Sequence, residues 1–208
     1  MIDLHTHSTA SDGTLSPTEL IRHAREENIQ AIALTDHDTV EGVEEALLEG
    51  KSSGVEVVPG IEISAAYPNS TLHILGYYID HNDDKFQQNI SPLQKARKER
   101  NPKIIKKLQN LGIAIDLEEV ILESQTGQVG RPHFAQVLLK KGYVKNTQQA
   151  FEKYLKKGAS AYVDKFRYSP RDAIEHIRGC KGIPILAHPN TLNYHGEREL
   201  ESIIVWVR

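Results

Sequence analysis

Short apolar runs alternate along the chain with segments whose apolar residues recur at helical spacing. The runs are short enough for strands and occupy residues 2–7, 31–35, 55–59, 72–78 and 183–187. The helical segments occupy residues 16–28, 39–49 and 169–178. Strands that alternate with helices are typical of a parallel sheet covered by helices. The pattern therefore predicts an α/β protein with a parallel sheet.

Two Ser-Pro pairs mark the expected starts of helices. Ser16 and Pro17 are followed by Glu19, which combines an N-cap serine, a proline at the first helical position and the glutamate of a capping box. Ser169 and Pro170 repeat the first two of these signals. We therefore expect one helix to begin at each pair.

The composition changes between residues 85 and 161, where charged helical sequence replaces the short apolar runs. Helices are expected there at residues 95–111, 131–142 and 147–157. We therefore predict a small helical insert domain, residues 85–161, within an α/β domain made of residues 1–84 and 162–208.

Composition places the chain among ordinary globular proteins. Of its 208 residues, 39% are hydrophobic and 25% are charged, and the net charge is -3. Because 28 Asp and Glu outnumber 25 Lys and Arg, no global basic field favours duplex nucleic acid or a membrane surface. Cys180 is the single cysteine, and no apolar run approaches the roughly 18 residues of a membrane helix. The start of the chain lacks the features of a secretory signal, so we expect a cytoplasmic protein.

Side chains that can bind metal ions recur at or just past the ends of the predicted strands. They are His5, His7, Asp12, His37, Glu62, His73 and His188. The carboxyl ends of parallel strands meet at one edge of a sheet, so these donors are expected to converge. Imidazole and carboxylate ligands suit Zn, Mn or Fe, and the lack of a cysteine cluster argues against a closed structural zinc site. The sequence therefore predicts an open, catalytic metal site.

Each of these residues also has a purely structural interpretation. His5 and His7 lie two apart and share one face of a strand in any case. Residues 35–38 suit a capped turn with a solvated charge cluster. Glu62 suits a surface acid and His73 a hydrogen-bonded core histidine. All of these interpretations would have to hold together at successive strand ends, which favours the metal site.

The motifs resemble those of the PHP (polymerase and histidinol phosphatase) superfamily, and their spacing is similar to that of its small stand-alone phosphoesterases, the TrpH-like branch. The resemblance spans essentially the whole chain and rests on His5-Thr6-His7, Ser11-Asp12-Gly13, Thr35-Asp36-His37-Asp38, Gly60-Ile61-Glu62-Ile63-Ser64, His73-Ile74-Leu75-Gly76 and Ala187-His188-Pro189. It implies a distorted (β/α)7 barrel with metal ions at the carboxyl ends of the strands. It also implies that the helical insert contributes to the substrate pocket.

The resemblance further implies roles for individual residues. It places His5, His7 and Glu62 on one metal ion, Glu62, His73 and His188 on a second, and Asp12 and His37 on a third. Metal ions that lie a few ångströms apart lower the pKa of a bridging water toward about 7, which presents hydroxide to phosphorus. Glu62 and His37 are thus the expected catalytic residues, and two or three Mn, Zn or Fe ions are the expected cofactors.

Arg131 and His133 begin a helix of the insert and resemble a family segment whose Arg and His reach the substrate phosphate. A guanidinium suits this role because it grips phosphate in a bidentate manner. The alternatives are a surface charge for Arg131 and a capping histidine for His133. We expect His23, His81, His176 and His195, which lie outside the motifs, to be structural or exposed.

The family normally continues to a Gly-Ser-Asp-x-His type motif, whose Asp and His complete two of the metal sites. No such motif follows His188 in this sequence, which closes with an apolar run at residues 203–207. We therefore expect a barrel without its last strands, at most two firmly held metal ions and slow turnover. An open sheet edge exposes unpaired backbone groups, so self-association is also expected there.

The function implied by the resemblance is hydrolysis of nucleoside 3',5'-bisphosphates or of the ends of short RNA oligonucleotides. The nearly balanced charge favours such small substrates over long duplexes. One alternative is an amidohydrolase-type hydrolase, which also opens with His-x-His on a barrel strand, although residues 35–38 and 60–64 favour the PHP interpretation. The other is a degenerate PHP-fold module that binds metal without turnover, which the missing motif supports.

Overall fold

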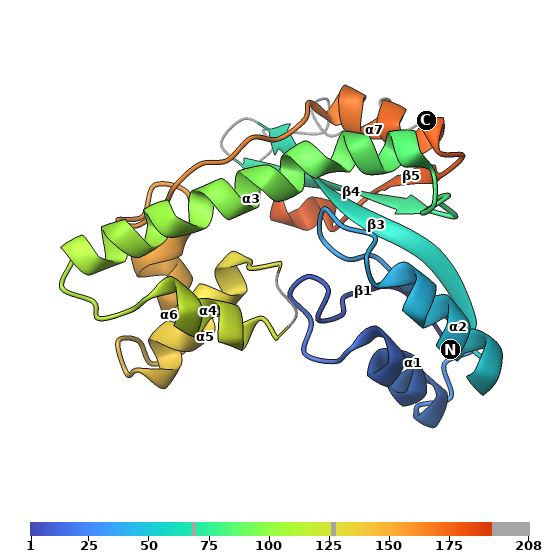
Figure 1. Ribbon diagram of the computed structural model, residues 1–208, viewed down its shortest axis with the longest axis horizontal. Coiled ribbons are helices and arrows are strands. Elements are labelled where there is room, and N and C mark those ends of the chain that lie inside the picture. The colour runs from blue at the N-terminus through green and yellow to red at the C-terminus, as the bar shows by residue number, and fades with distance from the viewer. Residues whose placement is uncertain (68–69, 126–127, 193–208) are drawn as a thin grey trace. The chain divides into compact units, whose positions relative to one another are not determined.

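The structure is a computed structural model that describes residues 1–67, 70–125 and 128–192 (Figure 1). Contacts between residues divide the chain into two units. One unit joins Met1–Pro92 to the described residues that follow from Arg167, and the other is Leu93–Phe166. The predicted insert, residues 85–161, overlaps the second unit, and the division into domains stays a prediction. His195 and the apolar run at residues 203–207, together with the open edge predicted there, lie outside the described residues.

The first unit contains a mixed sheet. Its described strands follow the order β1 (Ile2–Thr6), β2 (Ala31–Leu34), β3 (Glu56–Tyr67), β4 (Ser70–Tyr77) and β5 (Ile183–Leu186). The pairs β1–β2 and β2–β3 are parallel, whereas β3–β4 and β4–β5 are antiparallel. The α/β class is confirmed, but the expected parallel sheet is wrong for the second half. Two residues separate β3 from β4, and a parallel pair needs a crossover of about a dozen residues or more.

Strand β3 changes its pairing partner at Gly60. Its residues 56–59 pair with β2 and its residues 60–67 pair with β4. A Cβ atom at Gly60 would lie 2.9 Å from the Leu34 carbonyl oxygen and 3.0 Å from the Gly76 carbonyl oxygen. The strand thus passes between two others at a position that only glycine fits, and Glu62 follows directly beyond it. Closure into a seven-stranded barrel stays a prediction.

Helices α1 (Pro17–Glu26) and α2 (Val43–Ser53) pack on the parallel part of the sheet. The predicted capping box of α1 is confirmed, because the Ser16 hydroxyl accepts from the Glu19 N–H at 3.2 Å and the Glu19 carboxylate accepts from the Ser16 N–H at 2.8 Å. The helices and strands share one buried apolar cluster, formed by Ile21, Ala24, Ile32, Leu34, Ala46 and Val55.

Helix α2 begins at Val43, later than the predicted residue 39. The chain after β2 first extends the sheet, because the Asp38 N–H donates to the Glu62 carbonyl oxygen at 3.0 Å. Helical geometry therefore begins only after this segment has paired with β3. Helix α7 (Pro170–Gly179) does begin as predicted, with the Ser169 hydroxyl accepting from the Asp172 N–H at 3.1 Å.

The described part of the second unit is built of helices. Helix α3 (Asp84–Asn110) leads into it and is followed by α4 (Leu117–Glu123), α5 (Arg131–Lys140), α6 (Thr147–Ala150) and a π-helical turn (Phe151–Leu155). Its buried core includes Ile104, Leu108, Val120, Phe134 and Leu138. Helix α3 begins at Asp84, before the predicted residue 95. It continues through Pro92, although a proline usually ends or kinks a helix.

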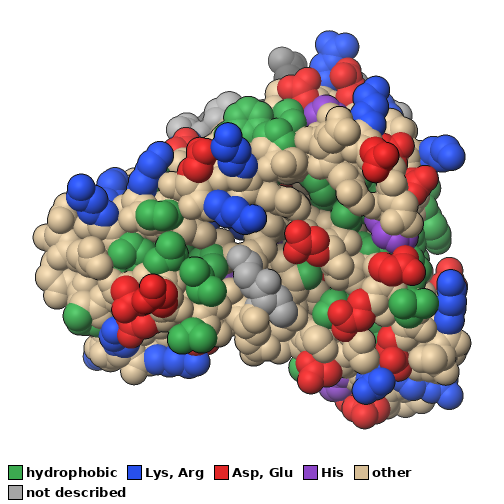
Figure 2. Space-filling view, in the orientation of Figure 1, with side chains coloured by type: hydrophobic (Ala, Val, Ile, Leu, Met, Phe, Trp, Pro, Cys, Tyr) green, Lys and Arg blue, Asp and Glu red, His purple; other side chains and the backbone are tan. Residues whose placement is uncertain are grey.

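Charged side chains of both signs are interspersed over the visible face (Figure 2). This distribution agrees with the small net charge of -3 and shows no large area of one sign on that face. Among the helices that the structure describes, none combines the length and the apolar character needed to cross a membrane. The cytoplasmic location and the absence of duplex binding stay predictions.

Candidate metal centre

Glu62 lies in β3 with 1% of its surface exposed and is the centre of a histidine cluster. Its Oε2 atom lies 3.0 Å from His5 Nε2, 3.1 Å from His7 Nε2 and 3.2 Å from His37 Nδ1. Its Oε1 atom lies 2.8 Å from His73 Nδ1 and 2.9 Å from His188 Nε2. One buried carboxylate thus contacts five imidazoles.

Several strands deliver these histidines to the carboxylate. His5 belongs to β1, His7 follows it, and His37 follows β2 and forms a bridge with Glu62. These three positions match the expected convergence at the ends of parallel strands. His73 differs, because it lies within the antiparallel strand β4, in register with Ser64 rather than at a strand end.

His188 follows β5 and has an unusual backbone conformation. Its φ of 26° lies in the region that residues with a Cβ atom rarely adopt. Such strain costs about 1–3 kcal/mol and is concentrated at functional sites. In this conformation the His188 ring lies against Glu62 and within 3.2 Å of His73 Nδ1.

The electrostatics of the cluster follow from burial and from hydrogen bonding. Burial by itself raises the pKa of the Glu62 carboxyl, but hydrogen bonds from the surrounding histidines outweigh it and hold the pKa far below its ordinary value of 4.5. Burial lowers the pKa of His7, yet Glu62 and Asp12 overcome this and raise it above 6.5. The hydrogen bond to Glu62 raises the pKa of His188. Glu62 is therefore ionised at neutral pH, as a metal ligand must be.

Two sets of donors have the compactness that a metal ion requires. Within each set, the ligand atoms lie within 4.8 Å of one another, and the sets are His5, Glu62 and His188, and His7, His37 and Glu62. The resemblance instead paired His5 with His7. In the observed sets, the His5 ring stacks on His188 and the His7 ring on His37. Which ion each residue binds stays a prediction.

Asp12 lies on the other side of two of these rings from Glu62. Its Oδ2 atom is 3.7 Å from His37 Nε2, and its Oδ1 atom is 3.9 Å from His7 Nδ1. Zn–ligand distances are about 2.0–2.2 Å, so a separation of 3.7 Å between two donor atoms leaves room for an ion that contacts both. The shared ion of Asp12 and His37 stays a prediction.

Asp36 and Asp38 flank His37 and are both buried. Asp38 accepts a hydrogen bond from the Ser64 N–H at 2.8 Å. Asp36 accepts hydrogen bonds from the N–H and hydroxyl of Ser8 and from the Ser11 hydroxyl. The sequence-based alternative of a capped turn with a solvated charge cluster is wrong, because both carboxylates are buried, Asp36 against the loop after β1 and Asp38 against strand β3. Ser8 directly follows His7, and Ser11 opens the motif at residues 11–13; these positions are the sequence signal that could have indicated both serines.

Arg131 and His133 have structural partners in the helical unit. Arg131 donates to the Leu155 carbonyl oxygen at 3.1 Å, and its guanidinium lies 5.8 Å from the Tyr162 ring centre. His133 is 6% exposed, and its Nδ1 atom accepts from the Gly130 N–H at 2.9 Å. His133 thus has the capping contact considered as an alternative, and the phosphate contacts of both residues stay predictions.

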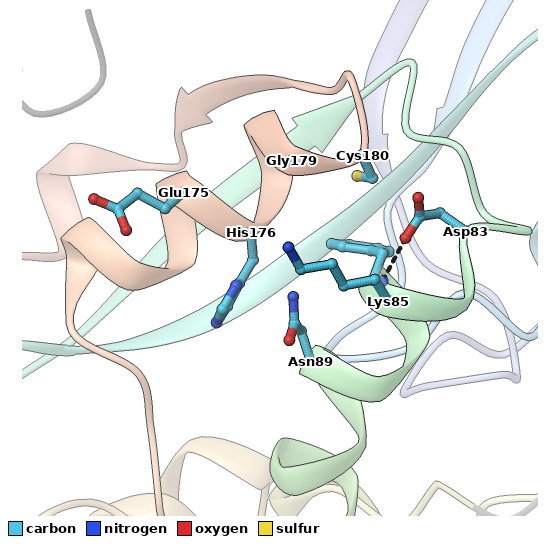
Figure 3. Close-up of a pocket in the computed structure, with 8 residues that line it drawn as sticks. Asp83, Lys85, Asn89, Glu175, His176, Gly179 and Cys180 are labelled. Carbon is cyan, nitrogen blue, oxygen red and sulfur yellow. Dashed lines mark hydrogen bonds between the residues drawn. The ribbon is translucent and has the colours of Figure 1, made fainter.

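A separate cavity of about 340 Å³ lies in the first unit between α3 and α7 (Figure 3). Its lining residues are Asp83, Lys85, Phe86, Asn89, Glu175, His176, Gly179 and Cys180. Figure 3 shows Lys85 and Asn89 on α3 and His176 on α7. Asp83 accepts from the Phe86 N–H at 2.6 Å and thus caps α3. The lining contains none of the residues around Glu62, so the cavity is separate from the metal centre.

Comparison with known proteins identifies the family of this chain. The model of the PHP domain matches residues 3–176. A 5'-3' exoribonuclease of Haemophilus influenzae is 38% identical over 99% of this chain, and a 3',5'-nucleoside bisphosphate phosphatase of Chromobacterium violaceum is 33% identical over 98%. The structure of an amidohydrolase from Chromobacterium violaceum, with bound sulfate and no metal, matches 98% of this chain with a TM-score of 0.93 and 33% identity. The chain spans 72% of the length of each of these proteins. It therefore belongs to the PHP domain family.

Proposed function

We propose that the protein is a metal-dependent phosphoesterase that hydrolyses nucleoside 3',5'-bisphosphates or the ends of short RNA oligonucleotides. The observation that carries the proposal is the buried carboxylate of Glu62 in contact with five imidazoles. Such a donor set fits divalent ions that bind nitrogen and oxygen ligands. The activities for which the two relatives are named support the nucleotide substrate class.

Two ions fit the donors that lie close together. His5, Glu62 and His188 would hold one, and His7, His37 and Glu62 would hold the other. Asp12 adds a carboxylate next to His37 for a third, more weakly held ion. The prevalence of imidazole favours Zn, Fe or Mn over Mg or Ca.

Bound divalent ions supply a water activated at neutral pH and neutralise the charge on phosphate oxygens. The protein's own contribution is a fixed negative charge among the histidines. Glu62 keeps a negative charge inside the protein and offers one oxygen to each side of the cluster. His73 Nδ1 lies 2.8 Å from Glu62 and 3.2 Å from His188 Nε2, so it would offer a further nitrogen ligand beside His188.

Two other functions remain as alternatives. The structural neighbour described as an amidohydrolase supports an amide substrate on the same metal centre. A PHP-fold module that binds metal without turnover would keep the histidine cluster and lack activity. Substrate tests separate all three, because the first predicts phosphate release, the second amide hydrolysis and the third neither.

The test is reconstitution of the chelator-treated protein. The full chain would be stripped of metal, dialysed against Zn²⁺, Mn²⁺ or Fe²⁺, and assayed with adenosine 3',5'-bisphosphate, a 5'-phosphorylated trinucleotide and simple amides. We expect phosphate or nucleotide release that requires metal. Metal-dependent hydrolysis of amides alone, or firm metal binding with no turnover on any substrate, would overturn the proposal.

A further inference from the structure

The cavity between α3 and α7 is lined by one face of each helix. On α3, Lys85 and Asn89 lie four residues apart and therefore share a face. On α7, His176 and Gly179 lie three residues apart and likewise share a face. Figure 3 shows the side chains of Lys85, Asn89 and His176 reaching from the two helices into the same space. Three side chains that carry nitrogen thus meet in a cavity of about 340 Å³.

The polar ends of these three side chains lack partners within the part of the chain that the structure describes. The Lys85 ammonium and the Asn89 side-chain amide make no hydrogen bond or ion pair with the described residues. His176 Nε2 is buried and has no hydrogen-bond partner among them either, while the His176 ring packs edge-on against Tyr168 at 4.5 Å. Buried polar groups are nearly always hydrogen-bonded, so unpaired groups that share one cavity indicate a ligand.

The charges of the lining favour an anion. Asp83 and Glu175 also line the cavity, but both carboxylates are already engaged. Asp83 accepts from the Phe86 N–H at 2.6 Å, and Glu175 accepts from Arg171 Nε at 2.9 Å. In Figure 3 the Glu175 carboxylate points away from Lys85. Among the described residues that line the cavity, Lys85 is thus the charged one left without a hydrogen bond or an ion pair.

The remainder of the lining leaves room for more than a small ion. Phe86 and Cys180 border the cavity, and each is 1% exposed. A Cβ atom added at Gly179 would meet no atom within 4 Å, so open space adjoins α7 there. Cavities of about 300–1,000 Å³ in which a few polar groups stand among apolar ones suit small organic molecules. The cavity therefore fits a ligand that has an apolar body as well as a charged end.

We propose that this cavity binds a small organic anion. The carboxylate or phosphate oxygens of the anion contact Lys85, Asn89 and His176. Ammonium and amide groups donate to such oxygens, and an imidazole nitrogen that carries a proton does the same. The apolar body of the anion lies against Phe86 and Cys180. This site is separate from the metal centre, and the proposal does not depend on the proposed phosphoesterase activity.

The first experiment compares three probes of similar shape. Benzoate and phenylphosphonate carry the two kinds of anionic group on the same ring, and benzamide is neutral. Phenylphosphonate has no ester bond, so a phosphoesterase cannot hydrolyse it. In titration calorimetry of the full chain with its metal, at least one anion should bind about ten- to a hundredfold more tightly than benzamide, because hydrogen bonds between charged groups are the stronger ones. The tighter anion identifies the preferred group. Equal affinity for benzamide, or no binding of either anion, would overturn the proposal.

The second experiment uses variants to locate the bound anion, with thermal melts to show that each one folds. Lys85→Met keeps the length of the side chain and removes its charge, so affinity should fall about ten- to a hundredfold. His176→Phe keeps a ring against Tyr168 and removes the nitrogens, and Gly179→Leu fills the open space without weakening the helix, so both should also weaken binding. Lys95→Met is the matched control, because Lys95 is exposed on the same helix outside the lining. Wild-type affinity in any of the three cavity variants would overturn the proposal.

A last comparison separates this cavity from the metal centre. Glu62→Gln should keep the affinity for benzoate, whereas Lys85→Met should keep the turnover of adenosine 3',5'-bisphosphate. Loss of benzoate binding in Glu62→Gln together with wild-type binding in Lys85→Met would assign the anion to the metal centre and overturn the proposal. Cavity-dependent binding of benzoate by a chain that hydrolyses no phosphate ester would support this proposal and refute the proposed function.

Discussion

Replacing Glu62 with Gln should lower turnover more than replacing any one of the histidines. The oxygens of Glu62 contact imidazole nitrogens at 2.8–3.2 Å, and an amide keeps only one acceptor oxygen. If that oxygen takes the place of Oε2, His73 and His188 meet an NH₂ group where a carboxylate oxygen lay 2.8 and 2.9 Å away. At least two charge-assisted contacts are then lost, together with the negative charge.

The magnitude follows from the number of contacts. A hydrogen bond to a charged group contributes about 1.5–3 kcal/mol, so two such contacts amount to about 3–6 kcal/mol. Since about 1.4 kcal/mol corresponds to a factor of ten, kcat/KM should fall by about 10²- to 10⁴-fold. Replacement of one histidine by Ala removes a single contact to Glu62, for which the same arithmetic gives about 10- to 100-fold.

The assay compares phosphate release from adenosine 3',5'-bisphosphate with metal content by elemental analysis. Glu56→Gln is the matched control, because Glu56 lies in the same strand, is exposed and makes no contact to the histidine cluster. The control should keep both metal content and rate. If Glu62→Gln retained wild-type metal content and rate, Glu62 would not be the shared ligand and the reasoning would be refuted.

Three further predictions concern other parts of the molecule. Arg131→Ala should raise KM for phosphorylated substrates, with kcat/KM reduced about ten- to a hundredfold and metal content unchanged, as for a lost charge-assisted phosphate contact; unchanged kinetics would restrict Arg131 to its contact with the helical unit. Gly60→Ala should destabilise the fold by about 1–3 kcal/mol, because its Cβ atom would lie 2.9 Å from a backbone oxygen of β2; a melting temperature equal to that of the wild type would contradict this. In the metal-free chain, the ionised Glu62 contributes stability that is present above pH 4.5 and lost as pH falls through its lowered pKa. The raised pKa values of His7 and His188 add stability that is present below pH 6.5 and lost as pH rises through them. Thermal melts should therefore show greatest stability of this cluster between about pH 4.5 and 6.5 without metal, and a shift of that maximum to higher pH with Zn²⁺, because binding needs unprotonated imidazole. The same maximum with and without Zn²⁺ would mean that these histidines do not bind the ion.

Structural features that depend on a few neighbouring residues could be predicted from the sequence alone. The capping box of Ser16 and Glu19 and the Ser169-Pro170 start depend on neighbours within one helical turn, and both appear as expected. Strands β1, β2 and β5 follow from short apolar runs, with ends within one or two residues of the predicted ones. His5, His7, His37 and His188 could be named because they lie at or near the ends of these strands, whereas Glu62 and His73 lie inside β3 and β4.

The arrangement of those ligands was decided by the tertiary structure. His5 and His188 both contact Glu62, although 57 and 126 residues separate them from it along the chain. No local pattern encodes the approach of His5 to His188, which places both in one compact set of donors with Glu62. The antiparallel pairing of β3 and β4 likewise depends on how β3 passes Gly60, where two backbone oxygens leave no room for a side chain.

The residues that support the ligands show the same division. From the sequence, Asp36 is one of several acids in a turn, with nothing to distinguish it from Asp38. In the structure it accepts hydrogen bonds from Ser8 and Ser11, which lie 28 and 25 residues away along the chain. The residues that could bind metal can thus be recognised from short segments of the sequence. Their geometry arises from long-range pairing of strands and loops, because only folding brings a single carboxylate within 3.2 Å of histidines from several strands.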